Sequence, residues 1–336
     1  MKGLFFSAFI IFPFFLHSES AGLLSEAWEL SSGSSSVPVD ILDATVRERS
    51  LESFNPGDLV VASDHGENRI QFLLSFKYPV IPLESLDLGF GAYRLQGLDF
   101  AYDGLFDFYI WTRYSQPLVS RLQNPGLYFS FKAAQAQRLW DMDSFEAGWF
   151  HESNGQVVDT LEEYNDLVQE YGLGARDYIS RGWDYWYLST KFSYHPYDGL
   201  EAEGATQAHR THIRLSFVPS LRIYDGAQGI VLAAEQNIFW EPQNPPSYIY
   251  DYDGLRALFN LEFSFPYRAF NYLGLSAGFR TGYNVGYFGQ NWSKQFSITF
   301  KTWHLPWYLY YNNGYGPYIS DYSSWSEGYG VGLRVW

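Results

Sequence analysis

Residues 255–265 read LRALFNLEFSF, and apolar side chains occupy alternate positions through most of this stretch. Arg256, Asn260 and Glu262 lie between them. Because successive side chains of a β-strand point to opposite faces, this pattern predicts a strand with one apolar face and one polar face.

The same alternation recurs along the chain from residue 69 onward. Segments of about ten residues suit strands that cross a membrane at a tilt. We therefore predict an all-β fold, a transmembrane antiparallel β-barrel of about 12 strands. The predicted strands lie at 69–78, 98–111, 126–133, 144–153, 183–194, 209–218, 229–239, 254–265, 271–282, 294–303, 306–312 and 327–336.

A soluble β-sandwich is the alternative, because its strands also alternate between a polar and an apolar face. Two features favour the barrel. The apolar faces carry almost no charge, whereas Arg and Lys populate the opposite faces. Aromatic residues make up 20% of the chain although the mean hydropathy is −0.22, and membrane barrels use aromatic girdles at both interfaces.

The chain begins with Met1-Lys2, an apolar run at 4–16 and small residues up to Ala21, which is typical of a secretory signal peptide at residues 1–20. A membrane anchor is the alternative, but the run is short for spanning a bilayer. Residues 21–67 are polar and rich in turn formers, so we predict an N-terminal periplasmic segment there and the barrel at 68–336.

The composition excludes some functions. A formal net charge of −15 argues against a nucleic-acid partner, because phosphate binding needs clustered Lys and Arg. The chain has no cysteine, so it has neither disulfides nor thiolate metal ligands. Its acidic residues gather in predicted loops, where they could attract divalent cations or simply be solvated.

The predicted strand at 144–153 places His151 and Ser153 on one face, beside Trp149 and Ala147. A base next to a hydroxyl is the arrangement that activates a serine nucleophile. Asp184 begins the next predicted strand, on the face that the composition assigns to lipid. If the two strands form an antiparallel hairpin, all three side chains lie at one level outside the barrel, as a Ser-His-Asp triad requires. Alternatively, they are ordinary polar residues at the membrane interface.

These residues resemble the bacterial outer-membrane phospholipase A family. The similarity is carried by EAGWFHESNG at 146–155 and SRGWD at 180–184, with looser matches at 115–118, 124–129, 314–316 and 321–322. It is good over about 98–194 and 307–336 and faint elsewhere.

The resemblance implies an outer-membrane enzyme that hydrolyses phospholipid acyl esters at sn-1 and also sn-2, requires Ca²⁺ and is active as a homodimer. By position, Ser153 would be the nucleophile, His151 the general base and Asp184 the orienting residue. The amide of Gly155 would contribute to the oxyanion hole. The positions implied for calcium are Ser115, contributed by the partner subunit, Asp177 and Ser180.

The chain departs from the family pattern in three places. The family usually has Asn where this chain has Asp184, and often a basic residue where it has Gln156. The segment 156–179 is much longer than the family's loop, and its Arg176 is a candidate replacement for the missing basic group. Three alternatives therefore remain: a family member that has lost activity, a small-solute pore, and a secreted β-sandwich esterase.

Overall fold

The computed structural model describes residues 50–64, 67–110, 121–133, 140–156, 158, 160–172, 175, 178–198, 212–224, 249–265, 269–283, 290–303, 305–315 and 325–335. The strands are β1 (Gly57–Asp64), β2 (Glu67–Pro82), β3 (Gly89–Phe90), β4 (Tyr93–Tyr109), β5 (Arg121–Ala133), β6 (Trp140–Ser153), β7 (Gly182–Asp198), β8 (His212–Tyr224), β9 (Gly254–Ser264), β10 (Tyr272–Gly282), β11 (Trp292–Thr302), β12 (Leu305–Tyr315) and β13 (Trp325–Val335). Helix α2 (Leu161–Tyr171) and two short 3-10 turns, η2 (Glu84–Leu86) and η6 (Ile249–Asp251), complete the described elements.

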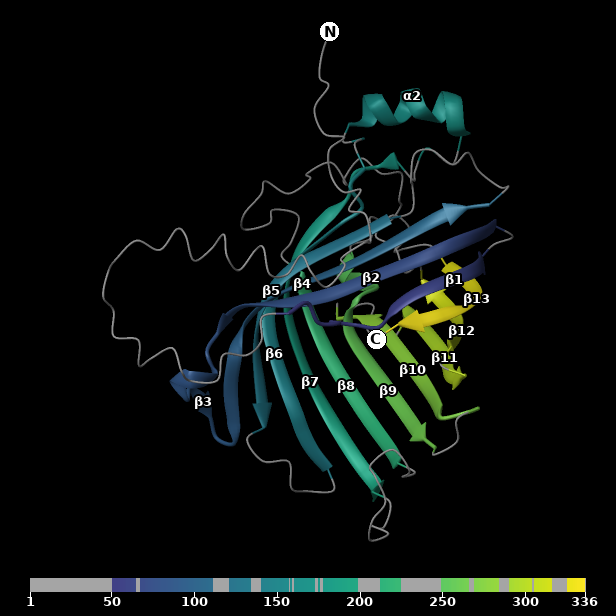
Figure 1. The fold of residues 1–336 in the computed structure, drawn as a ribbon. Coiled ribbons are helices and arrows are strands. Elements are labelled where there is room, and N and C mark those ends of the chain that lie inside the picture. The colour runs from purple at the N-terminus through teal and green to yellow at the C-terminus, as the bar shows by residue number, and fades with distance from the viewer. Residues whose placement is uncertain are drawn as a thin grey trace, which may run out of the picture. The chain divides into compact units, whose positions relative to one another are not determined.

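The sheet closes on itself. From β4 to β13 each strand pairs antiparallel with the next, β13 pairs with β1, β1 with β2, and β2 with β4 (Figure 1). The ring therefore contains twelve strands, and the two-residue β3 pairs only with the first two residues of β4. The predicted fold class, a closed antiparallel barrel of about twelve strands, is confirmed.

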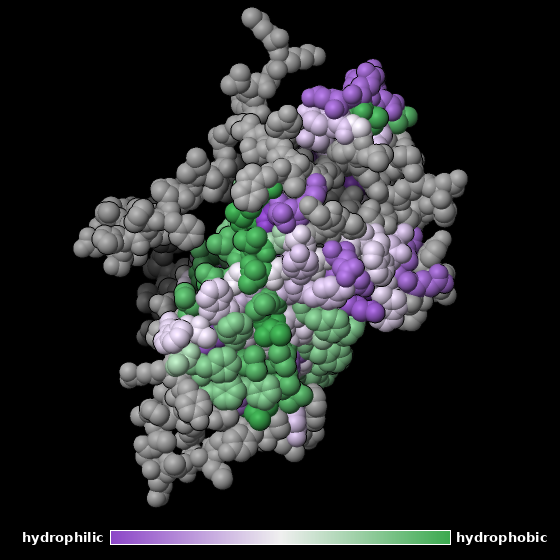
Figure 2. All heavy atoms as spheres, turned by 90° about the vertical axis from the view of Figure 1, so that its right-hand side faces the viewer, coloured by the Kyte–Doolittle hydropathy of each residue, from purple (hydrophilic) through white to green (hydrophobic). Residues whose placement is uncertain are grey.

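The barrel wall is apolar outside and polar inside. On β2, Ile70, Phe72 and Leu74 are exposed on the outer face, whereas Arg69, on the inner face of the same strand, is buried. The outer faces of later strands repeat this pattern: Phe296 and Ile298 on β11 and Val331 and Val335 on β13 are all exposed. Figure 2 shows hydrophobic side chains gathered over the lower part of one side of the barrel, with hydrophilic residues above them. A sandwich would bury its apolar faces against each other, so this distribution fits a barrel whose outer surface meets lipid.

Strand β1 corrects the predicted start of the barrel at residue 68. Gly57–Asp64 pairs with both β13 and β2 and lies within the wall. Its alternation is hard to see in the sequence because both faces are apolar in the middle of the strand: Leu59 and Val61 are exposed, while Val60 and Ala62 pack inside against Tyr308 and Tyr310. The predicted signal peptide at residues 1–20 and residues 21–49 of the predicted periplasmic segment lie outside the described residues.

The predicted strand at 229–239 also falls outside the described residues. The twelve-strand count is nevertheless reached, because β1 was not among the predicted strands. Among the residues that the structure describes, no helix is long and apolar enough to cross a membrane.

The lumen holds a cavity of about 470 Å³ lined by aromatic and charged side chains. On the lumen side of β6 and β7, aromatic side chains pack together. Phe54 lies against Tyr128 and Phe150, and the rings of Phe150 and Tyr185 stack with their centroids 5.7 Å apart. Tyr128, Phe150 and Tyr185 belong to the larger buried apolar cluster of the described residues, and the partly buried Phe54 packs against it. The site-bearing hairpin therefore has a rigid backing on its inner side.

Candidate active site

The hairpin of β6 and β7 brings the predicted triad residues to one level. In the antiparallel register, His151 lies directly opposite Asp184, and Ser153 lies opposite Gly182. Directly paired residues of neighbouring strands project to the same face and approach closely. The end of one strand and the beginning of the next thus hold the imidazole and the carboxylate side by side.

The three side chains point away from the lumen. Glu152 and Tyr185, which alternate with them, line the lumen cavity. On the same face as Asp184, Trp186 is 50% exposed and Leu188 is 37% exposed. The imidazole, hydroxyl and carboxylate therefore lie on the apolar outer face of the wall.

The imidazole and the carboxylate are hydrogen-bonded. His151 Nδ1 lies 2.8 Å from Asp184 Oδ1, with the Asp184 side chain 6% exposed and that of His151 31% exposed. A proton on Nδ1 that is donated to this carboxylate leaves Nε2 as an acceptor, which is the tautomer a general base needs.

Ser153 follows His151 by two residues on the same face. Within the described residues its hydroxyl makes no hydrogen bond to the imidazole. Serine–histidine contacts are often loose in ligand-free hydrolases and tighten when substrate binds, so a rotation of either side chain is what the chemistry requires.

A buried asparagine fixes the chain just after the serine. Asn154 is fully buried, and its amide oxygen accepts hydrogen bonds from the backbone N–H groups of Gln156 (3.2 Å) and Arg181 (3.0 Å). Its amide nitrogen donates to the carbonyl of Ile179 at 2.8 Å. Asn154 thereby ties the end of β6 to the segment that leads into β7.

Gly155 adopts a left-handed backbone conformation, with φ of +58°, and is exposed. Within the described residues no acceptor is bonded to its N–H. The guanidinium of Arg121 donates to the carbonyl of Asn154 at 2.7 Å and to that of Gly155. These contacts hold the peptide carbonyls on one side of the turn and leave an N–H donor next to the nucleophile, as an oxyanion hole needs.

The residues implied for calcium are only partly described. Ser180 lies in the segment that leads into β7, and its N–H donates to the carbonyl of Val158 at 2.7 Å. Ser115, Asp177 and the candidate cation Arg176 lie outside the described residues. The described part of the chain contains no group of three or more His, Cys, Asp or Glu side chains placed to hold a metal. A donor set of two hydroxyls and a carboxylate offers only oxygen atoms, which is the chemistry that Ca²⁺ prefers.

Sequence reasoning missed three residues at this site. Asn154 lies within the quoted motif, but only the structure shows that its side chain ties the turn to the segment before β7. Arg121 was missed because it lies at the start of β5, more than thirty residues before the turn it contacts. Gln123 lies directly opposite Ser153 across β5 and β6, a relationship that depends on register alone.

The fold and the site together define a class: a closed twelve-stranded barrel that carries a hydrolase-like Ser, His and Asp constellation on its outer, apolar face. The same fold is found in outer membrane phospholipase A. The Escherichia coli structure superposes with a TM-score of 0.53 at 15% sequence identity, covering 88% of this chain and 96% of that one. A Salmonella typhi dimer with bound calcium gives a TM-score of 0.52 at 15% identity, covering 86% and 93%.

At this identity the likeness shows the fold, and the resemblance found in the motifs agrees with it. No protein-family model matches the chain. No curated protein matches it either.

Proposed function

We propose that this protein is an outer-membrane phospholipase that hydrolyses acyl ester bonds of phospholipids at Ser153. The observation that carries the proposal is the 2.8 Å hydrogen bond between His151 and Asp184 on the same outer face as Ser153. Burying a carboxylate on the lipid-facing side of the wall is costly, so this pair favours a catalytic role over that of ordinary polar residues in a passive barrel wall.

The proposed reaction follows the logic of serine hydrolases. His151 Nε2 removes the proton from Ser153 Oγ as the oxygen attacks the ester carbonyl, and Asp184 stabilises the imidazolium that forms. The imidazolium then protonates the leaving lysophospholipid alkoxide, which leaves an acyl group on Ser153. Water, activated by the same imidazole, attacks the acyl-enzyme and releases the fatty acid.

The Asn154-Gly155 turn supports the charged intermediate. The N–H of Gly155 is the donor for the developing oxyanion, and the Arg121 guanidinium beside the turn adds positive charge. A preorganised donor of this kind contributes about 10²–10³ in kcat.

Calcium and dimerisation are part of the proposal. The Salmonella typhi structure of this fold is a dimer with bound calcium. In this chain Ser180 and Asp177 would hold the ion, with Ser115 from a second copy. When bound there, Ca²⁺ would add positive charge near the developing oxyanion.

The outer membrane is the location that this function needs. Exposed apolar side chains cover the outer wall, and the triad residues lie on that wall rather than in the lumen. A phospholipid could therefore reach Ser153 from within the bilayer, without leaving it for water.

The lumen cavity favours a second candidate function, a pore for small solutes. Its lining includes Arg69, Arg222, Arg256, Arg280 and Lys294. Recordings in planar bilayers separate the two candidates. Stable large conductance without lipase activity supports the pore, and closed bilayers with lipase activity support the enzyme.

Hydrolysis by matched variants tests the proposal. The protein, refolded in detergent with Ca²⁺, should release fatty acid from phospholipid micelles, and Ser153→Ala and His151→Ala should each lower kcat by about 10³-fold or more. Ser276→Ala, which removes a strand serine on β10, is the control and should leave the rate unchanged. Equal rates for Ser153→Ala and the original chain would remove the basis of the proposal.

A further inference from the structure

The two residues that alternate with the triad on the inner side of the hairpin are both buried. Glu152 lies between His151 and Ser153, and Tyr185 follows Asp184. Both line the lumen, and neither is more than 4% exposed. Their positions are coupled to the outer site, because each is the direct neighbour in the chain of a triad residue.

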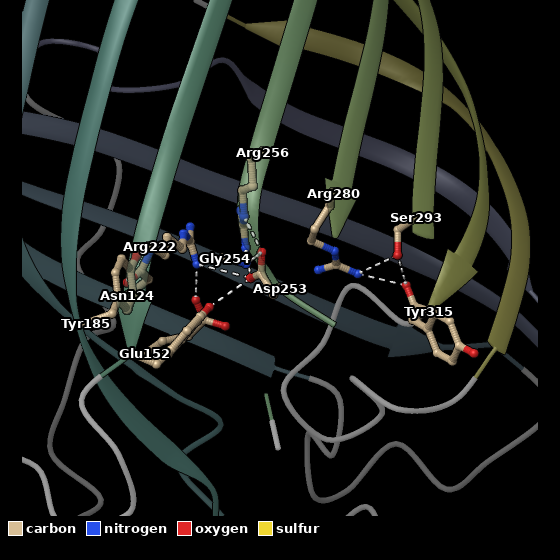
Figure 3. Close-up of polar contacts among 11 residues, drawn as sticks. Asn124, Glu152, Tyr185, Arg222, Asp253, Gly254, Arg256, Arg280, Ser293 and Tyr315 are labelled. Carbon is tan, nitrogen blue, oxygen red and sulfur yellow. Dashed lines mark hydrogen bonds and ion pairs between the residues drawn. The ribbon is translucent and has the colours of Figure 1, made fainter. Parts of the chain in front are cut away.

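One arginine contacts both of them. Arg222 on β8 donates a hydrogen bond to Glu152 at 2.5 Å, and its guanidinium carbon lies 4.5 Å from the centroid of the Tyr185 ring (Figure 3). The Tyr185 hydroxyl donates to Asn124 of β5 at 2.9 Å. Through these contacts a single side chain joins the inner sides of β6, β7 and β8.

Arg222 is itself close to Asp253, which is hydrogen-bonded to two further side chains. Asp253 lies 4.0 Å from it, accepts a hydrogen bond from Tyr224 at 2.8 Å and pairs with Arg256 through two hydrogen bonds. Asp253 precedes β9, outside the strands. Burial alone would raise the pKa of its carboxyl, but Arg256, Arg280 and Arg222 hold that pKa well below its usual value. The Asp253 carboxylate therefore stays charged over the ordinary pH range.

We propose that Arg222 is a positioning residue for the outer triad: its clamp on Glu152 and Tyr185 sets the distance and angle between Ser153, His151 and Asp184 from the opposite side of the wall. This inference rests on the proposed function and adds to it. Glu152 is joined through the backbone to His151 and Ser153, so a shift of Glu152 toward the lumen must also move these two residues. Misplacement by about 1 Å is enough to cost about 10²-fold in rate.

The chain contains a matched pair that serves as a control. Arg334 on β13 makes two hydrogen bonds to Asp58, at 2.7 and 2.8 Å, and lies 3.5 Å from the centroid of the Tyr308 ring. Like Arg222, it is a largely buried lumen arginine that joins a carboxylate and a tyrosine. It supports β1, β12 and β13, which do not pair with β6 or β7.

The experiment compares Arg222→Met with Arg334→Met in the full chain, refolded in detergent. Barrel formation is verified by the faster migration of unheated protein in electrophoresis. In the first arm, hydrogen–deuterium exchange is followed in peptides covering 146–155 and 182–188. Arg222→Met should lose protection there, and Arg334→Met should not.

In the second arm, hydrolysis kinetics are measured. Arg222→Met should lower kcat by about 10–10²-fold with KM within about twofold, whereas Arg334→Met should keep kcat within about twofold. Arg222→Lys, which keeps the charge but loses the planar contact with Tyr185, should recover part of the loss. If Arg222→Met fails to form a barrel, Glu152→Gln, which keeps a hydrogen-bond partner for Arg222, takes its place, with Asp58→Asn as its control.

The two proposals fail in different ways. Equal exchange and equal kcat in the two methionine variants would overturn the positioning role while leaving the phospholipase intact. An original chain that hydrolyses nothing would overturn the proposed function. The exchange arm would then still decide whether Arg222 fixes this end of the hairpin.

Discussion

His151 and Asp184 lie directly opposite each other in the β6–β7 ladder, and their side chains are joined by a 2.8 Å hydrogen bond on the outer face of the barrel. The carboxylate is buried while the imidazole is partly exposed. This asymmetry is what a base needs when it must be held firmly on one side and reach a substrate on the other.

The first prediction concerns the orienting residue. Asp184→Ala should lower kcat/KM for phospholipid by about 10²-fold or more, because the imidazole loses both its orientation and its counter-charge. Asp184→Asn should fall between this variant and the original chain, since an amide oxygen still accepts from Nδ1–H. Thr190→Val, on the same face of β7, is the control. A kcat/KM for Asp184→Ala equal to that of the control would show that the hydrogen bond has no catalytic role.

The second prediction concerns the turn that carries the oxyanion donor. Gly155→Ala should lower kcat by about 10-fold or more, because φ of +58° disfavours a side chain and the added Cβ would lie 3.0 Å from the Arg121 guanidinium. Gly172→Ala is a matched control: it has the same φ, and nothing lies within 4 Å of its added Cβ. Similar kcat values for the two variants would argue that the Gly155 backbone is not used in the reaction.

The third prediction concerns the buried Asn154 side chain. Asn154→Ala removes the acceptor for two backbone N–H groups and the donor to Ile179. Each unsatisfied buried group costs about 1–3 kcal/mol, so the unfolding midpoint in urea should fall measurably. Hydrogen exchange should increase first at 154–156 and 179–181. An unchanged midpoint with unchanged exchange would mean that water replaces these contacts without cost.

The fourth prediction concerns calcium. Chelation by EDTA should abolish hydrolysis reversibly, and Ca²⁺ should restore it better than Mg²⁺, because a flexible set of oxygen ligands suits the larger ion. Asp177→Asn should raise the Ca²⁺ concentration needed for half-maximal rate by about 10-fold or more. Full activity in EDTA would separate this protein from the calcium-bound structure that shares its fold.

The fifth prediction concerns the corrected start of the barrel. Deleting residues 57–64 exposes the pairing edges of β2 and β13, so the shortened chain should fail to close and should run as unfolded protein in unheated electrophoresis. If the barrel instead forms without this segment, β2 must be able to pair directly with β13.

The sequence predicted the class of fold well because lipid outside and polar groups inside impose a period of two on every long strand. The pattern at 255–265 is of this kind, and β9 occupies Gly254–Ser264. The same reasoning failed for β1, whose central inward positions are filled by Val60 and Ala62, although Asp58 near its start faces the lumen. Periodicity carries no signal where both faces are apolar.

The candidate site could be predicted in part for a related reason. His151, Ser153 and Asp184 are linked by strand phase and by a hairpin, and both are readable along the chain. Arg121 and Arg222 were not predictable, since they approach the hairpin from β5 and β8 through tertiary register. Two of the three residues implied for calcium lie outside the described residues, so their geometry remains a prediction from the resemblance.

Covalent labelling by a sulfonyl fluoride, followed by mass spectrometry of the modified peptide, tests most directly whether Ser153 is an activated nucleophile. We predict a single modification at Ser153, slowed by about 10²-fold or more in His151→Ala and in Asp184→Ala. Labelling at another residue, or equal labelling of Ser153 in the original chain and the His151→Ala variant, would contradict it.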